Sequence, residues 1–243
     1  MPLARHASLP RALRRCVPAV GAVLGAMLLG STAGCADLDD AGQGVTRNDL
    51  VTDLAVQLGR STSLTYSATY QLAGGATATV VQAQQPARSA LLYPDGRVTV
   101  TTDATTECRT AEKALTCTMT PPPASTVPVP ATLFAGAERH GMVNPTAVLN
   151  MLNTAALDAD VSVVQHDTTI AGRHATCVDV GDGADAPASR FQACITNDGV
   201  LGSFTGVLNG DAVDVAMTAF DSAADGAVFD PPPTATVIDR RRR

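Results

Sequence analysis

The chain has 243 residues, a formal net charge of −6 at pH 7, and a composition that is 45% hydrophobic but only 3% aromatic. This length is sufficient for one domain with a sizeable core. The acidic balance argues against a nucleic-acid partner, because an acidic surface repels the phosphate backbone.

Residues 1–34 have the pattern of a signal peptide. Residues 1–16 contain four arginines and no acid, and an apolar run of 17 residues follows from Val17 to Ala33. A membrane-spanning helix needs roughly 20 apolar residues, so this run is short for a span. A basic segment, a short apolar segment and small residues at its end indicate a secretion signal, which directs the chain out of the cytoplasm.

The end of this signal, Thr32-Ala33-Gly34-Cys35, resembles the lipobox of bacterial lipoproteins. In that family a diacylglyceryl group is attached to the cysteine sulfur, and the signal is cut immediately before the cysteine. The resemblance implies that Cys35 is lipidated and anchors the mature protein on the extracytoplasmic face of the cell membrane. Two other interpretations stay open: an ordinary signal peptidase would release a soluble protein, and an uncut signal would itself be the anchor.

The mature chain begins with a predicted tether and a predicted helix. Residues 36–46 are acidic and contain glycine, so we expect residues 35–46 to form a lipidated, flexible tether. A helix is predicted from Thr46 to Arg60. Thr46 is a suitable cap, and an apolar stripe recurs at intervals of four residues, at Leu50, Leu54 and Leu58.

From Leu64 onward, apolar and polar residues alternate, which is typical of strands with one buried face. Turns at Gly74-Gly75 and Asp95-Gly96 separate several such strands in the first half of the chain. Alternation resumes after residue 160, with tight hairpin turns at Asp198-Gly199 and Asn209-Gly210. These patterns predict two runs of consecutive antiparallel strands.

Two helical stretches separate the two runs of strands. The first covers residues 131–139 and follows a proline-rich segment, residues 121–130. The second is stronger, because Asn144 is a good cap and Pro145 suits the first helical position. The chain ends in four arginines, and we expect residues 231–243 to form a disordered basic tail; contact of this tail with anionic lipid headgroups is the alternative.

Four of the six cysteines predict disulfides. Cys16 lies in the signal and Cys35 takes the lipid, which leaves Cys108, Cys117, Cys177 and Cys194. An even number of cysteines in an exported chain indicates two disulfide bonds. We favour Cys108–Cys117 and Cys177–Cys194, since each pair brackets a hairpin or loop. The two other connectivities and a zinc site stay open, although no tight C-x-x-C pair is present.

The order of elements predicts an α+β fold in a single domain, residues 47–230. We expect a curved antiparallel sheet, or half-barrel, with helices on its concave face. This plan resembles the LolA-like half-barrel fold, which lipoprotein carriers, the mycobacterial LppX and LprG lipoproteins and RseB-type regulators share. The resemblance covers residues 46–230 in element order and rests on the stretches LTYSATYQL, YPDGRVTV, AGRHATCVDV and FQACITNDGVLGSFTG.

In that fold the half-barrel and its helices enclose an apolar cavity that holds acyl chains. The resemblance therefore implies that the protein binds or shuttles a hydrophobic ligand, foremost a lipid, without catalysis. The RseB-type regulators imply the alternative, a protein-binding sensor or scaffold with a packed core. The expected cavity lining is Met142, Val148, Leu149, Met151 and Leu152, although such a stripe is also typical of plain core packing.

No catalytic or metal-binding signature is present. His140, His166 and His174 lack the spacing of metal-binding motifs, and the chain has no nucleophile elbow or glycine-rich phosphate loop. The acid cluster in residues 179–186 lacks the order of a calcium loop. We therefore predict no enzymatic activity, no cofactor and no metal site.

Overall fold

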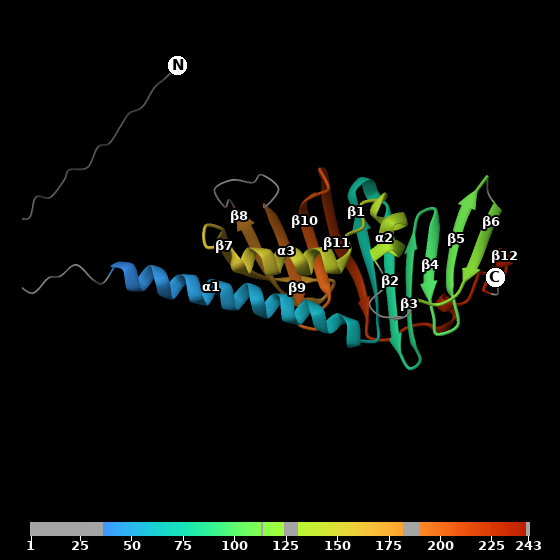
Figure 1. The fold of residues 1–243 in the computed structure, drawn as a ribbon, viewed down its shortest axis with the longest axis horizontal. Helices are drawn as coiled ribbons and strands as arrows, with labels where there is room; N and C mark the ends of the chain where they lie inside the picture. Colours follow the sequence, from blue (N-terminus) through green and yellow to red (C-terminus); the bar gives the residue numbers. More distant parts are fainter. Residues whose placement is uncertain (1–35, 113, 124–130, 182–189, 242–243) are drawn as a thin grey trace, which may run out of the picture.

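The computed structural model describes residues 36–112, 114–123, 131–181 and 190–241 (Figure 1). The predicted signal peptide, Cys16 and the predicted lipidation site Cys35 lie outside the described residues. Within the described ranges, no helix is both long enough and apolar enough to cross a membrane.

Twelve strands form one wide sheet. The first half of the chain contributes β1 to β6, which are Tyr66–Leu72, Thr77–Gln84, Ala87–Tyr93, Gly96–Val100, Thr105–Ala111 and Ala114–Thr120. The second half contributes β7 to β12, which are Ser162–Ile170, Arg173–Gly181, Phe191–Thr196, Leu201–Leu208, Asp211–Asp221 and Thr236–Asp239. The order across the sheet is β12-β6-β5-β4-β3-β2-β1-β11-β10-β9-β8-β7.

The predicted antiparallel half-barrel is wrong. The sheet is a single mixed sheet that is not closed, and strands make up 50% of the structure against 24% for helices. The two runs of strands merge because β11 pairs antiparallel with β1. The sheet is mixed because β12 pairs parallel with β6. It is open because its two outermost strands, β7 and β12, are not hydrogen-bonded to each other.

The predicted hairpin turns are confirmed. Asn209 and Gly210 both have positive φ, 54° and 91°, between β10 and β11. Two positive φ values in a two-residue loop match the right-handed twist of the strands that the loop joins. Gly74 and Gly75 likewise have positive φ in the turn between β1 and β2. Short local turns therefore set the antiparallel order within each half of the sheet.

The three α-helices of the described residues lie on one face of the sheet, which we call the helix face. They are α1 (Ala36–Gly59), α2 (Ala131–Glu138) and α3 (Pro145–Leu157), and α1 runs alongside α3 (Figure 1). Two side chains attach α1 to the strand ends: Arg47 Nη1 donates to the carbonyl of Val161 at 2.6 Å, and Gln57 Nε2 donates to the carbonyl of Thr196 at 3.0 Å.

The helix α1 begins at Ala36, ten residues before the predicted start at Thr46. The stretch 36–46, which we predicted as a flexible tether, is helical. Residues 36–46 have little apolar periodicity, which is the sequence signal that predicts a packed helix. The sequence pattern therefore marked the apolar, packed part of the helix and missed its polar beginning.

The main core lies between the helices and the sheet. Leu54 and Leu58 of α1 and Val148 and Leu152 of α3 are buried there together with aliphatic side chains of the strands. Val80 belongs to this core, whereas the adjacent Val81 belongs to a separate apolar cluster. Because successive side chains in a strand point to opposite faces, the second cluster lies on the other side of the sheet.

A segment that we call the C-terminal strap, residues 222–235, covers part of this other face. Its Phe229 is buried in the second cluster, and the guanidinium of Arg88 lies 4.4 Å from the centre of the Phe229 ring. Arg97 donates hydrogen bonds to the carbonyls of Val228 and Asp230. The strap leads into β12, so the prediction that residues 231–243 are a disordered tail is wrong for residues 236–239. The strand β6 pairs with β5 along one edge, and its other edge offers backbone hydrogen-bonding groups to β12. Val237 and Ile238 in β12 are β-branched and suit a strand.

Candidate functional site

A narrow cleft, which we call the interlayer cleft, lies where α1, α2 and α3 meet β1 and β2. Its walls are mainly apolar and include Leu58, Val80, Phe134 and Leu149. The free volume is about 60 Å³, which is room for a few water molecules or methylene groups. In this conformation the interlayer cleft admits a small apolar group and not a whole acyl chain.

Three polar side chains at the interlayer cleft, those of Gln82, Ser61 and Thr62, make hydrogen bonds within the protein. Gln82 is buried, and its Nε2 donates to the carbonyls of Ser61 at 2.7 Å and Leu64 at 2.9 Å. Burial raises the pKa of Tyr66, which also lines the cleft, to about 12. Tyr66 is therefore uncharged at neutral pH, and the cleft offers mostly apolar contacts.

A second cleft, which we call the hairpin cleft, lies between the α2–α3 connection and the β10–β11 hairpin. Its volume is about 300 Å³, at the lower end of the range for small-molecule sites. The floor is apolar and consists of Met142, Ala147, Leu208 and Val213. The exposed rim is polar and consists of Glu138, Arg139, Asn209 and Asp211. An apolar floor below a charged rim suits a molecule with one apolar part and one polar part.

Asn144 joins the two clefts. It lines both of them and is buried. Its Oδ1 accepts a hydrogen bond from the backbone N–H of Thr146 at 2.9 Å, and this bond caps α3. The interlayer cleft and the hairpin cleft therefore lie on either side of the start of α3, both on the helix face.

The five predicted ligand residues divide between clefts and core. Met142 lines the hairpin cleft and Leu149 lines the interlayer cleft. Val148 and Leu152 are fully buried in the main core, and Met151 is partly buried against it. Their role in ligand binding stays a prediction. Leu208 and Val213 were not predicted from the sequence, because a hairpin turn at Asn209-Gly210 does not reveal which helix end the hairpin will face.

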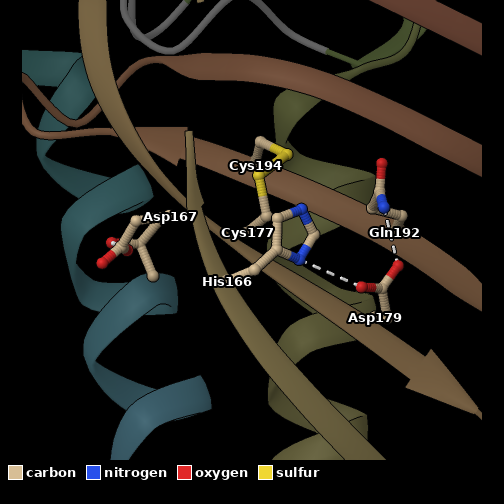
Figure 2. Close-up of a disulfide and its surroundings, with 7 residues drawn as sticks. His166, Asp167, Cys177, Asp179, Gln192 and Cys194 are labelled. Atoms are coloured by element: carbon tan, nitrogen blue, oxygen red, sulfur yellow. Dashed lines mark hydrogen bonds and ion pairs between the residues drawn. A yellow bond between two sulfur atoms is a disulfide. The ribbon is translucent and has the colours of Figure 1, made fainter. Parts of the chain in front are cut away.

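Both predicted disulfides are confirmed, with the local connectivity. Cys108 is bonded to Cys117 across β5 and β6, with an S–S distance of 2.05 Å, and Cys177 to Cys194 across β8 and β9, with an S–S distance of 2.04 Å (Figure 2). Each pair occupies directly opposite positions in its ladder. The cysteines are therefore structural cross-links between neighbouring strands.

The histidines do not converge. His166 Nδ1 lies 3.2 Å from Asp179, whose other carboxylate oxygen accepts a hydrogen bond from Gln192 Nε2 at 2.6 Å (Figure 2). His140 Nε2 lies 2.6 Å from Asp95, in the other half of the sheet. Among the described residues, no group of three His, Cys, Asp or Glu side chains could hold a metal ion. These are separate pairs on the surface.

An open hollow of about 620 Å³ lies beside the His166–Asp179 pair, bordered by Asp179, Gln192 and Thr205. Gly181 and Arg190 also line it. This hollow is wide open to solvent, so the two more enclosed clefts on the helix face are the candidate site.

Comparison with known proteins adds little. No protein-family model matches the chain, and no curated protein matches it. A crystal structure of an uncharacterised conserved protein from Thermus thermophilus aligns with 78% of this chain and 98% of its own, at 12% identity and a TM-score of 0.43. A TM-score of this size does not establish a shared fold.

Proposed function

We propose that this protein is an exported lipoprotein, anchored through Cys35, that binds an amphiphilic ligand such as a lipid and performs no covalent chemistry on it. The anchor follows from the signal-peptide and lipobox patterns of residues 1–35. The ligand site is the hairpin cleft, with the interlayer cleft as its continuation past Asn144.

The observation that carries this proposal is the composition of the hairpin cleft. Binding sites for small molecules combine apolar walls with a few polar groups that fix orientation. Here Met142, Leu208 and Val213 would contact an apolar chain, and Arg139 at the rim would face a polar or anionic head. The neighbouring interlayer cleft, with about 60 Å³ of free volume, would receive only the end of such a chain.

The experiment is native mass spectrometry of the full chain, exported in a bacterial host and extracted from membranes in mild detergent. We expect a stoichiometric adduct that dissociates on denaturation. Ala147→Phe fills the hairpin cleft and should reduce adduct occupancy at least tenfold. Asn150→Phe adds the same ring to an exposed position of the same helix that lines neither cleft, so it should leave occupancy unchanged.

Two results would contradict the proposal. One is a wild-type protein that stays bare after incubation with vesicles of bacterial envelope lipids. The other is an adduct that Ala147→Phe and Asn150→Phe affect equally. The denatured sample also reports the anchor, because a diacylglyceryl mass must be present in the wild type and absent from Cys35→Ser.

A second candidate function is a protein-binding scaffold. The observation in its favour is the complete burial of Val148 and Leu152, two of the predicted cavity-lining residues, in the packed main core. A bare protein in the experiment above, together with an unchanged melting temperature for Ala147→Phe, would favour this second function.

A further inference from the structure

The strand β7 leaves one edge of the sheet open. It lies at the end of the strand order, with β8 as its one neighbour in the described sheet. It has nine residues, SVVQHDTTI, and pairs with β8 without a register shift. Proteins usually protect such edges with charged side chains, proline, a bulge or a very short strand. The strand β7 has one acidic residue, Asp167, and none of the other devices. At the other end of the sheet, β12 has only four residues.

The hairpin geometry shows which backbone groups of β7 point outward. Ile170 and Arg173 are paired and enclose the two-residue turn Ala171-Gly172, so they form the hydrogen-bonded pair that closes the hairpin. The N–H and C=O groups of alternate residues therefore point away from β8. These outward residues are Val163, Gln165, Asp167 and Thr169.

This strand is complementary to a second copy of itself. If two copies of β7 pair antiparallel around a twofold axis at His166, Gln165 lies opposite Asp167 of the second copy, and Val163 lies opposite Thr169. Shifting the centre to a neighbouring residue leaves at least one of the four outward residues without a partner. The centred register uses all four and would form about eight backbone hydrogen bonds.

The side chains also fit this register. A glutamine opposite an aspartate repeats a pair that the sheet already contains, in which Gln192 Nε2 donates to Asp179 at 2.6 Å. One oxygen of Asp167 accepts from Thr176, and the other is the acceptor for Gln165 of the second copy. Val164, which is 62% exposed, would lie beside Thr168 of the second copy and lose contact with water.

The helix α1 supplies an independent observation. Arg47 attaches it to Val161 just before β7, and its N-terminal part extends beyond the edge of the sheet (Figure 1). The eleven residues 36–46 span about 16 Å, which is about three strand widths. A strand added to β7 would lie beneath this part of the helix, below which no strand of the described residues lies.

The geometry points to a homodimer in which β7 of each copy pairs antiparallel with β7 of the other, so that two sheets become one continuous sheet. The interface is isologous, because the same strand of each copy contacts that strand of the other copy. This inference is independent of the proposed ligand site, which lies at the start of α3 and on the β10–β11 hairpin.

The first test is cysteine cross-linking in the full chain, purified from membranes in detergent. In the centred register, residue 164 of one copy lies opposite residue 168 of the other. The double variant Val164→Cys/Thr168→Cys should therefore form a covalent dimer under mild oxidation, at least tenfold more than either single variant. In each single variant the two new cysteines would lie about 13 Å apart, too far for a disulfide.

The second test measures the mass of the complex by sedimentation in density-matched detergent. The wild type and Gln165→Ala should be dimers, and Gln165→Pro should be a monomer, because proline removes an outward N–H and leaves the β7–β8 ladder intact. Circular dichroism and the melting temperature show whether Gln165→Pro is folded. Three results would each overturn the proposal: a monomeric wild type, no cross-link in the double variant, or a dimer that persists in folded Gln165→Pro. A monomeric wild type would indicate instead that the edge of β7 is available to a strand of a different protein.

Discussion

Two buried residues, Tyr66 and Tyr70, stabilise the centre of the sheet. Tyr70 of β1 donates its hydroxyl to the carbonyl of Leu201 in β10 at 2.9 Å, so it bridges the two halves of the sheet. Tyr66 and Tyr70 are almost fully buried. Burial raises the pKa of Tyr66 to about 12 and raises the pKa of Tyr70 well above its ordinary value. Both groups therefore couple the fold to pH in the alkaline range.

We predict that the protein loses stability above pH 10. The unfolded chain releases the proton of Tyr66 near pH 10, whereas the folded protein retains it up to about pH 12. Rising pH in this window therefore favours the unfolded state, by about 1.4 kcal/mol per pH unit for each such tyrosine. Urea unfolding at successive pH values measures this slope, and Tyr66→Phe should make it shallower. Free titration of both tyrosines near pH 10 in the folded protein would contradict the prediction.

Among the secondary-structure elements, α3 begins where its capping residue and proline predict. Asn144 caps the helix and Pro145 occupies its first turn, as the sequence predicts. The capping bond satisfies one of the backbone N–H groups that a helix start otherwise leaves unpaired. Because Asn144 also lies between the two clefts, the same residue begins the helix and shapes the candidate site.

We predict that Asn144→Ala lowers the free energy of unfolding by about 1 kcal/mol, the usual cost of a lost N-cap. Asn144→Ser should retain most of the stability, because its hydroxyl can accept the same bond from Thr146. Urea denaturation of the two variants measures the difference. Equal midpoints for alanine and serine would show that the cap contributes nothing.

Elements were predictable from the sequence where the signal is local. The caps of α3, the glycine turns and the two disulfide pairs each depend on residues close together in the chain. The start of α1 was missed because residues 36–46 have little apolar periodicity. In the candidate site, Met142 could be named in advance, whereas its neighbours Leu208 and Val213 are brought there by tertiary packing across more than 60 residues of sequence.

At the scale of the whole molecule, the two runs of consecutive strands meet at a central seam, the β1–β11 ladder, while β12 returns to pair with β6 at the far end of the sheet. The half-barrel prediction failed at this scale, because alternation along a strand does not specify how far a sheet curves or which strand lies at its edge. The parallel pairing of β12 with β6 joins Thr236 to Thr116, and no local pattern marks such a distant partner.

We predict that deleting β12 destabilises the protein and promotes aggregation. A chain that ends after Asp230 would expose the edge of β6 and lose the hydrogen bonds of the final strand. A chain that ends after Arg240 keeps β12 and is the matched control. Light scattering on heating and the melting temperature distinguish the two. Identical behaviour of the two truncations would show that β12 contributes nothing to the fold.

The placement of the two disulfides has a mechanical consequence. Each closes a loop inside one half of the sheet, with sequence separations of 9 and 17 residues, and neither crosses the β1–β11 seam. A chain pulled from its two ends would therefore keep both loops closed and would extend about 90 Å less than its length allows. The resistance of the seam itself comes from hydrogen bonds and side-chain packing, so the two halves can separate under load while each stays internally cross-linked.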